Sequence, residues 1–211
     1  MENRQFKEKK FWDKFANNYD SFIKKTLDKT YVSINEEIDS ELKENSNVLE
    51  IGTGTGIIAF SIFSKVSSIV ATDISEEMIH IAKQKQNDLN IDNIDFQVQD
   101  SYNLTFPDKS FDIVVASNLF HLLYEPKKPL DEVKRVLKEN GVFIAPTFCV
   151  GENMKSKIIS SIAGFISGFR IINKCCMKDL EKLLSSNGLM VEKAVKIDGR
   201  FPLAYIVLRK A

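Results

Sequence analysis

The stretch VLEIGTGTGIIAF, from Val48 to Phe60, decides the fold of this chain of 211 residues. An apolar run leads into three glycines, Gly52, Gly54 and Gly56, which alternate with threonines, and a second apolar run follows. Glycine permits positive φ and leaves room for a ligand where a Cβ would block it. A glycine turn between a first strand and a helix marks the ligand-binding edge of doubly wound sheets. We therefore expect an α/β fold with a ligand against this turn.

The spacing of the glycines narrows the class of ligand. A dinucleotide fingerprint, G-x-G-x-x-G, requires a glycine at position 57, where the chain has Ile57. The sequence instead reads E-x-G-x-G-x-G from Glu50 to Gly56, and no G-K-[ST] follows as in a P-loop. Both a nicotinamide oxidoreductase and a P-loop nucleotide hydrolase are therefore disfavoured.

Outward from the glycine turn, short segments rich in Val, Ile and Phe alternate with helix-like segments. Strands are expected at 47–51, 68–73, 94–99, 111–117 and 141–146, and helices at 56–65, 75–89 and 129–138. This alternation implies parallel pairing with right-handed crossovers. Near-continuous apolar strands fit burial on both faces of the sheet.

The two ends of the chain depart from this alternation. A helix at 177–188 precedes two strand-like segments, 189–197 and 202–210, whose separation by DGR predicts an antiparallel hairpin. The first 45 residues are expected to form helices, with an interruption at Asn17 and Asn18. The sequence thus predicts a doubly wound, mostly parallel sheet of seven strands, with a C-terminal antiparallel hairpin and N-terminal helices.

Acidic residues follow the second and third predicted strands. Asp73 ends the second strand, where an ionised carboxylate could accept hydrogen bonds from both hydroxyls of a ribose. Its alternative role is a helix N-cap, for which Ser75 is the better residue. Asp100 and Ser101 follow the third strand; a carboxylate there could accept from an adenine amino group, although an aspartate in a turn is common.

The composition limits partners and location. Lys and Arg number 29, as do Asp and Glu, so no global field attracts a polyanion, and nucleic acid is not expected as a partner. The first residues are charged where a signal peptide would be apolar, and no apolar run reaches the length of a membrane span. Three cysteines, two of them adjacent, argue against a disulfide framework. We expect a cytoplasmic protein.

Four segments taken in order resemble the class I S-adenosylmethionine-dependent methyltransferases, especially the small single-domain methyltransferases of type 11. These segments are VLEIGTGTG, IVATDISEEMI, FQVQDSYNLTFPDKSFDIVVASNLFHLL and EPKKPLDEVKRVLKENGVFI. FWDKFANNYD near the N-terminus and LEKLLSSNGLMVEKAVK near the C-terminus are also similar, so the resemblance covers most of the chain. It implies a Rossmann-like fold that ends in an antiparallel hairpin, and S-adenosylmethionine as the cofactor.

The resemblance also implies a role for each residue of the site. Residues expected at the methionine end of the cofactor are Glu50, Gly52, Thr53, Gly54, Gly56 and Asn118, and Tyr19 is expected to close over the cofactor. Residues expected at its nucleoside end are Asp73 on the ribose, Ile74 and Met78 beside the adenine, and Asp100 and Ser101 at the adenine edge. No metal site is expected.

Methyl transfer from a sulfonium is an in-line displacement, in which the protein mainly aligns the acceptor and excludes water. A general base is needed only if the acceptor must lose a proton. His121, just past the fourth predicted strand, and Tyr19 are the candidates for a chemical role, and the family often has an orienting histidine at the former position. His80 is expected to be an exposed residue of a helix.

We expect one methyltransferase domain over residues 1–211. Its parts are a helical cap (1–45), a cofactor-binding core (46–148), an acceptor-side helix or lid (149–175), and the last helix with the hairpin (176–211). Apolar residues recur at helical spacing within 154–174, which predicts a helix over the active site, a wall for an apolar acceptor, or a helix on a membrane surface.

Several functions fit these patterns. The first is transfer of a methyl group to O, N, S or C of a small, partly apolar acceptor. An RNA or protein methyltransferase is disfavoured by the neutral composition and by SNLF where an Asn-Pro-Pro-Tyr type tetrad would stand. A non-catalytic, S-adenosylmethionine-binding regulatory protein is a further alternative. Thiolates of Cys149, Cys175 and Cys176 could hold trivalent arsenic, but their pattern does not match arsenic methyltransferases.

Overall fold

The computed structural model describes residues 2–149, 176–186, 188–199 and 201–210. Its helices are α1 (Glu2–Thr26), α2 (Asp28–Asp39), α3 (Ile57–Ile62), α4 (Glu76–Leu89), α5 (Lys127–Val136) and α7 (Met177–Ser185), with 3-10 turns η1 (Phe63–Lys65) and η2 (Phe120–Leu122). Its strands are β1 (Asn47–Ile51), β2 (Ser68–Asp73), β3 (Ile94–Val98), β4 (Phe111–Val115), β5 (Leu137–Ile144), β6 (Thr147–Phe148), β7 (Leu189–Ile197) and β8 (Leu203–Lys210). In this part of the chain, no helix combines the length and apolar character needed to cross a membrane.

The strands form one mixed sheet in the order β3-β2-β1-β4-β5-β8, with β7 on the other side of β8. Strands β1 to β5 pair in parallel, whereas β8 runs antiparallel to β5, β6 and β7. The mostly parallel sheet and the C-terminal hairpin are therefore confirmed. The sheet has eight strands instead of seven, because two residues after β5 pair with the start of β8 as β6.

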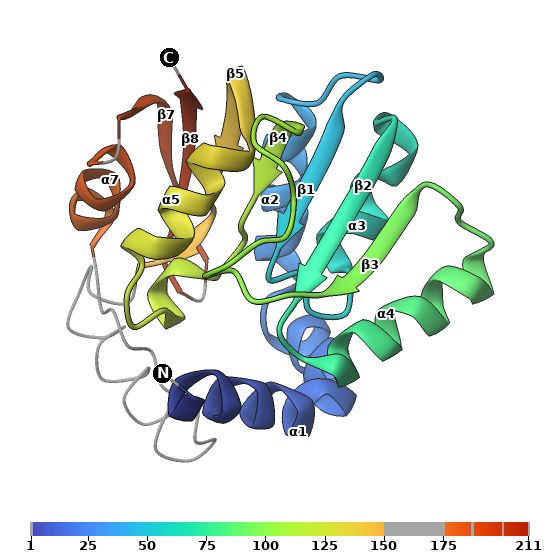
Figure 1. Ribbon diagram of the computed structural model, residues 1–211. Helices are drawn as coiled ribbons and strands as arrows, with labels where there is room; N and C mark the ends of the chain where they lie inside the picture. The colour runs from blue at the N-terminus through green and yellow to red at the C-terminus, as the bar shows by residue number, and fades with distance from the viewer. Residues whose placement is uncertain (1, 150–175, 187, 200, 211) are drawn as a thin grey trace.

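Helices cover both faces of the sheet, and neighbouring residues of each central strand pack on opposite faces. Val48 packs with α2, α3 and α4, whereas Leu49 packs with α5 and α7. The same alternation holds for Tyr205 and Ile206 in β8. In Figure 1, α5 and α7 lie on the near side of the sheet and α2 and α3 on the far side. Burial on both faces explains the nearly continuous apolar runs of these strands.

The strand order reverses next to β1, which pairs with β2 on one side and β4 on the other. In such sheets, ligands bind in the crevice at the carboxyl ends of the strands at this switch point. Helix α1 runs below the carboxyl ends of β1, β2 and β3 (Figure 1). The crevice is thus covered by the N-terminal part of the chain.

The predicted interruption of the first helix is wrong, because α1 continues through Asn17 and Asn18 to Thr26. Both asparagines are exposed, whereas their neighbours Ala16 and Ile23 are buried. Tertiary packing of an inner face stabilises a helix more than intrinsic propensity does, so two poor helix formers on the outer face are tolerated.

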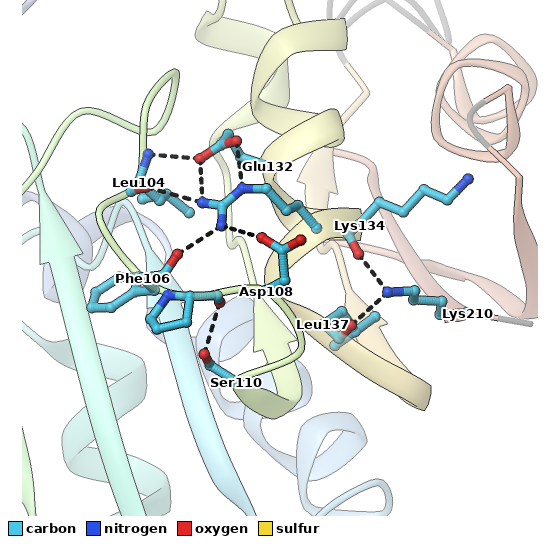
Figure 2. Close-up of polar contacts among 10 residues, drawn as sticks. Leu104, Phe106, Asp108, Ser110, Glu132, Lys134, Leu137 and Lys210 are labelled. Carbon is cyan, nitrogen blue, oxygen red and sulfur yellow. Dashed lines mark hydrogen bonds and ion pairs between the residues drawn. The ribbon is translucent and has the colours of Figure 1, made fainter.

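Arg135 of α5 holds the connection between β3 and β4, whose residues Leu104, Phe106 and Asp108 are labelled in Figure 2. Its guanidinium donates to the carbonyl oxygens of Leu104 (3.0 Å) and Phe106 (2.7 Å) and to the carboxylates of Asp108 and Glu132. Glu132 in turn accepts from the Leu104 N–H at 2.8 Å. The planar fork of arginine suits such a set of acceptors, which a lysine could not satisfy together. This cluster orders a connection that is otherwise irregular.

The end of the sheet is tied to α5 by a second cation. Lys210 of β8 donates to the carbonyl oxygens of Lys134 (2.9 Å) and Leu137 (2.7 Å), as Figure 2 shows. The last carbonyls of a helix lack partners within the helix, and a cation there also complements the helix dipole. The contact fixes the end of α5 against the antiparallel part of the sheet.

We expect Arg135→Met to lower the free energy of unfolding by about 2–4 kcal/mol, because two loop carbonyls and Glu132 lose their donors. Denaturant unfolding followed by circular dichroism measures this change. Lys128→Met, on the same helix, removes only an exposed ion pair with Glu125 and should leave the unfolding midpoint unchanged. Equal midpoints for the two variants would show that Arg135 does not order the connection.

Candidate functional site

A cavity lies between the carboxyl ends of β1 to β4 and helix α1. Its lining residues come from five regions of the chain: α1, the turn after β1, the end of β2 with the start of α4, and the connections after β3 and β4. They are Glu8, Trp12, Tyr19, Ile51, Gly52, Gly54, Asp73, Ile74, Met78, Gln99, Asp100, Ser101, Ser117, Asn118, Leu119, Leu122 and Leu123. The sequence predicted nine of these by number: Tyr19, Gly52, Gly54, Asp73, Ile74, Met78, Asp100, Ser101 and Asn118.

The glycine turn forms the floor of this cavity. Gly52 and Gly54 have φ of 73° and 56°, a conformation that side-chain-bearing residues rarely adopt. A Cβ on Gly54 would lie 3.3 Å from Cε1 of Tyr19, and one on Gly52 would lie 3.2 Å from Leu119. At Gly52 and Gly54, main-chain atoms therefore face the cavity with no side chain attached.

Gly56 and Thr53 help to shape the turn but do not line the cavity. Gly56 is the left-handed N-cap of α3, and a Cβ there would lie 2.8 Å from the ring of Phe60 and 2.9 Å from that of Phe96. Thr53 is buried and donates its hydroxyl to Glu50. Their predicted contact with the methionine end remains a prediction, although both residues hold the shape of the turn.

Glu50 is a buried carboxyl group under the glycine turn. Its Oε2 accepts from the Thr53 hydroxyl (2.8 Å) and from the Ala59 N–H (3.0 Å), which joins β1 to the turn and to α3. Burial raises the pKa of Glu50 to about 8, although these two hydrogen bonds oppose the shift. Glu50 does not line the cavity, and its predicted support of a methionine amino end remains a prediction.

Asp73 connects the turn after β1 to the turn after β2. Its Oδ2 accepts from the Gly54 N–H at 2.9 Å, and its Oδ1 accepts from the Ser75 N–H at 3.0 Å. Burial raises the pKa of Asp73, while these N–H groups and that of Ile74 counteract the rise. Each oxygen retains a lone pair for a ligand in the cavity. Ser75 caps α4 through Met78 N, as predicted.

Asp100 faces both the cavity and α1. Its Oδ1 accepts from the Tyr102 N–H at 3.1 Å, and its Oδ2 accepts from the Arg4 guanidinium at 2.7 Å. The Arg4 guanidinium also bonds Glu8 and lies 3.7 Å from the centroid of the Tyr102 ring. Ser101 lines the cavity beside Asp100. The two predicted adenine-edge residues thus lie where α1 closes on the connection after β3.

Two tyrosines and an asparagine meet at the other end of the cavity. The hydroxyls of Tyr19 and Tyr31 lie 3.4 Å apart, and Asn118 Nδ2 donates to the Tyr31 hydroxyl at 3.5 Å. Asn118 Oδ1 accepts from the Phe148 N–H, and its φ is 54°. Burial raises the pKa of both tyrosines, so their hydroxyls stay neutral and can donate or accept.

His121 lies in η2, is buried and does not line the cavity. Burial lowers its pKa to about 3, so the imidazole is neutral at physiological pH. Its Nδ1 is buried without a hydrogen-bond partner in the described structure. An imidazole with such a low pKa is a weak base, which disfavours His121 as a general base. Its chemical role remains a prediction. His80 is exposed on α4, as predicted.

Sequence reasoning missed the contributions of Glu8, Trp12 and Tyr31. Glu8 and Trp12 share one face of α1 with Tyr19, at spacings of four and seven residues, and this pattern was available in the sequence. Tyr31 gives no comparable signal, because only the packing of α2 brings it beside Tyr19. The acceptor-side helix predicted at 154–174, with its three alternative roles, lies outside the described residues.

The arrangement suits a ligand with hydroxyl and amino groups and an apolar ring. Carboxylates of Asp73 and Asp100 provide acceptors only, and Ile74 and Met78 provide apolar walls. Glu8 lines the cavity, and its Oε1 is buried without a hydrogen-bond partner among the described residues. Among the described residues, no group of three or more His, Cys, Asp or Glu side chains could hold a metal ion.

Known protein families and sequences match this chain over its core. A family model described as "Methyltransferase domain" matches residues 42–165. UbiE of Rickettsia bellii (strain OSU 85-389), a ubiquinone/menaquinone biosynthesis C-methyltransferase, is 32% identical over 165 residues, which are 75% of this chain and 63% of that protein. The chain thus spans less than two thirds of the length of this relative.

Solved structures share the fold. That of YcgJ from Bacillus subtilis superposes with a TM-score of 0.70 at 19% identity and covers 83% of this chain and 97% of that one. A SAM-dependent methyltransferase from Aquifex aeolicus has a TM-score of 0.66 at 24% identity and covers 84% of this chain and 89% of that one. At these identities the likeness concerns the fold alone.

The raised pKa of Glu50 predicts how the stability of the free protein depends on pH. The neutral carboxyl contributes fully below the unfolded-state pKa of 4.5, and this contribution is lost as pH rises through about 8. Relative to Glu50→Gln, which keeps an acceptor and cannot ionise, the protein should lose stability by up to about 1.4 kcal/mol per pH unit between these values.

Urea unfolding of both proteins at several pH values from about 5 to about 9 measures the difference. Titrating groups that do not interact with Glu50 cancel in this comparison, including buried His121, whose effect has the opposite sign. Parallel stability curves would show that Glu50 ionises normally beneath the turn.

Proposed function

This chain belongs to the class I S-adenosylmethionine-dependent methyltransferases, and on that premise we propose that it methylates a small, partly apolar molecule. A partly apolar acceptor is supported by one observation. Leu119, Leu122 and Leu123 form an apolar wall of the cavity next to Asn118. Apolar side chains with a few polar groups are typical of small-molecule sites. The similarity to UbiE proteins, which are named as C-methyltransferases, supports carbon among the four possible acceptor atoms.

The residues present fit the cofactor, S-adenosylmethionine. Gly52 and Gly54 form a cradle that a Cβ would fill, and acceptor-only carboxylates lie along the cavity at Asp73 and Asp100. In our proposal Asp73 accepts from the ribose hydroxyls, while Asp100 and Ser101 contact the adenine edge. Glu8 adds an acceptor that sequence reasoning did not include, because its buried Oε1 lacks a partner in the described structure.

When bound, S-adenosylmethionine supplies an activated methyl group, so the protein's contribution is mainly positioning and exclusion of water. Helix α1 provides the cover, with Trp12 and Tyr19 over the cavity. Tyr31 and the Phe148 N–H fix the side chain of Asn118 at the proposed methionine end. The neutral hydroxyls of Tyr19 and Tyr31 can orient a ligand without introducing a buried charge.

We expect Asp73→Ala to weaken the binding of S-adenosylmethionine by about 10- to 100-fold, because hydrogen bonds to a charged group are lost in a buried site. Calorimetric titration with S-adenosylmethionine and S-adenosylhomocysteine measures this, and NADH serves as a negative ligand. Asp92→Ala, which removes an exposed acid elsewhere, is the matched control. Because Asp73 also holds two backbone N–H groups, thermal melts must show that the variant is folded. Unchanged affinity in the folded variant would remove Asp73 from the site.

The acceptor class is tested with S-adenosylmethionine labelled on its methyl group and a cell extract separated into small apolar molecules, RNA and protein. We expect the label in the apolar fraction. Leu122→Gln should lower this transfer by about ten-fold, since a polar group disrupts the apolar wall, and should leave the affinity for S-adenosylhomocysteine unchanged. Label in RNA or protein would identify the macromolecular methyltransferase instead. Binding of cofactor without transfer to any fraction would favour a regulatory protein.

A further inference from the structure

We propose that the outer face of α1 is a docking surface for an anionic lipid bilayer. This outer face is defined as the exposed side chains of residues 4–26, which are Gln5, Phe6, Lys7, Lys10, Lys14, Asn17, Asn18, Ser21, Phe22, Lys24 and Lys25. Five of these eleven residues are lysines and none is acidic. A chain with equal numbers of acids and bases thus concentrates one sign of charge on one helix face.

Within residues 4–26, the three acidic side chains of α1 lie outside this outer face and have partners. Glu8 bonds Arg4, Asp13 bonds Lys9 and the Ser75 hydroxyl, and Asp20 bonds Lys85 and the Thr55 hydroxyl. In the part of the chain that the structure describes, none of the five outer lysines has an ion-pair partner. Their charges are therefore available to an external anionic surface.

Aromatic side chains accompany these lysines. Phe6 is 64% exposed and Phe22 is 43% exposed, which is unusual for such large apolar groups. Phe6, Lys7, Lys10, Phe11 and Lys14 line a hollow on the surface of the helix, and Lys10 Nζ lies 5.8 Å from the centroid of the Phe6 ring. Interfacial helices combine such rings, which enter the headgroup region, with lysines that contact anionic lipids.

The shape of the outer face favours a bilayer over a nucleic acid. Lys7 and Lys25 are separated by 18 residues of one helix, or about 27 Å, so the lysines form a straight stripe that suits a flat surface. The arginine of this helix, Arg4, is already held by Glu8 and Asp100 and offers no free fork for phosphates. Exposed phenylalanines beside the lysines are stabilised when they leave water, which a lipid interface permits.

The location of this face gives the contact a functional consequence. The opposite side of α1 carries Glu8, Trp12 and Tyr19, which line the cavity. Docking through the outer face therefore places the cover of the cavity against the membrane. The inference does not depend on the identity of the methyl acceptor, so its test needs no methyl transfer.

The test is sedimentation of the full chain with vesicles of phosphatidylcholine alone and of phosphatidylcholine mixed with phosphatidylglycerol. We expect binding to the anionic vesicles only, and its loss at high salt. The combined variant Lys7→Gln, Lys10→Gln, Lys14→Gln should lower the partition coefficient by about 100-fold, at about five-fold per lysine. Phe6→Ser should lower it by about ten-fold.

The matched control changes the same charge on other elements, with Lys43→Gln, Lys83→Gln and Lys178→Gln, three exposed lysines that should leave vesicle binding unchanged. Thermal melts establish that all variants are folded. The proposal is overturned by equal binding to neutral vesicles, by no binding to either, or by equal loss in the control. Binding of an RNA oligonucleotide without vesicle binding, or a dimer in light scattering that the α1 variants dissociate, would overturn it in favour of another occupant.

Discussion

The structure depends on a backbone turn held between the buried carboxyl group of Glu50 and the half-buried carboxyl group of Asp73. Glu50 supports the turn after β1 from below through Thr53 and Ala59, and Asp73 holds it from the side through the Gly54 N–H. Taking these carboxyl groups out of water is unfavourable, and this desolvation raises the pKa of both. Their hydrogen bonds fix the shape of the turn. In this shape the glycines have positive φ and lack Cβ atoms, so their main chain faces the cavity. The order of the strands then places the cavity residues that follow β2, β3 and β4 around this point.

Helix α1 separates this cavity from solvent, with one side facing the cavity and the other exposed. Its inner side closes the cavity with Trp12 and Tyr19, and polar contacts along its length anchor it to the loops that carry the site. Arg4 bonds Asp100 after β3, Asp13 bonds the cap of α4, and Asp20 bonds Thr55 in the glycine turn. Asp13 and Asp20 are engaged in these contacts, and the exposed side chains of residues 4–26 include lysines and phenylalanines but no acids. The charge of the outer face is thus a consequence of how the inner side is held.

The elements of the sheet could be predicted closely because their signals are local. Apolar runs bounded by turn residues placed β1, β2 and β7 at their observed bounds, and the glycine spacing placed the site at the end of β1. The predictions for α5 and β5 were displaced by a few residues, because the strand begins at Leu137, directly after the helix, and not at the glycine that follows. The continuity of α1 was missed because Asn17 and Asn18 are poor helix formers whose cost is offset by packing elsewhere on the helix.

The sequence by itself determined the fold class, the position of the glycine turn and the residues that follow each strand, since these depend on periodicity and on the geometry of parallel sheets. Tertiary structure alone decided which of those residues reach the cavity. Asp73, Asp100 and Asn118 line it, whereas Glu50, Thr53, Gly56 and His121 do not. It also decided that Tyr31 of α2 meets Tyr19 and Asn118. The physical reason is that burial and side-chain partnership arise from contacts between distant segments, which no local pattern encodes.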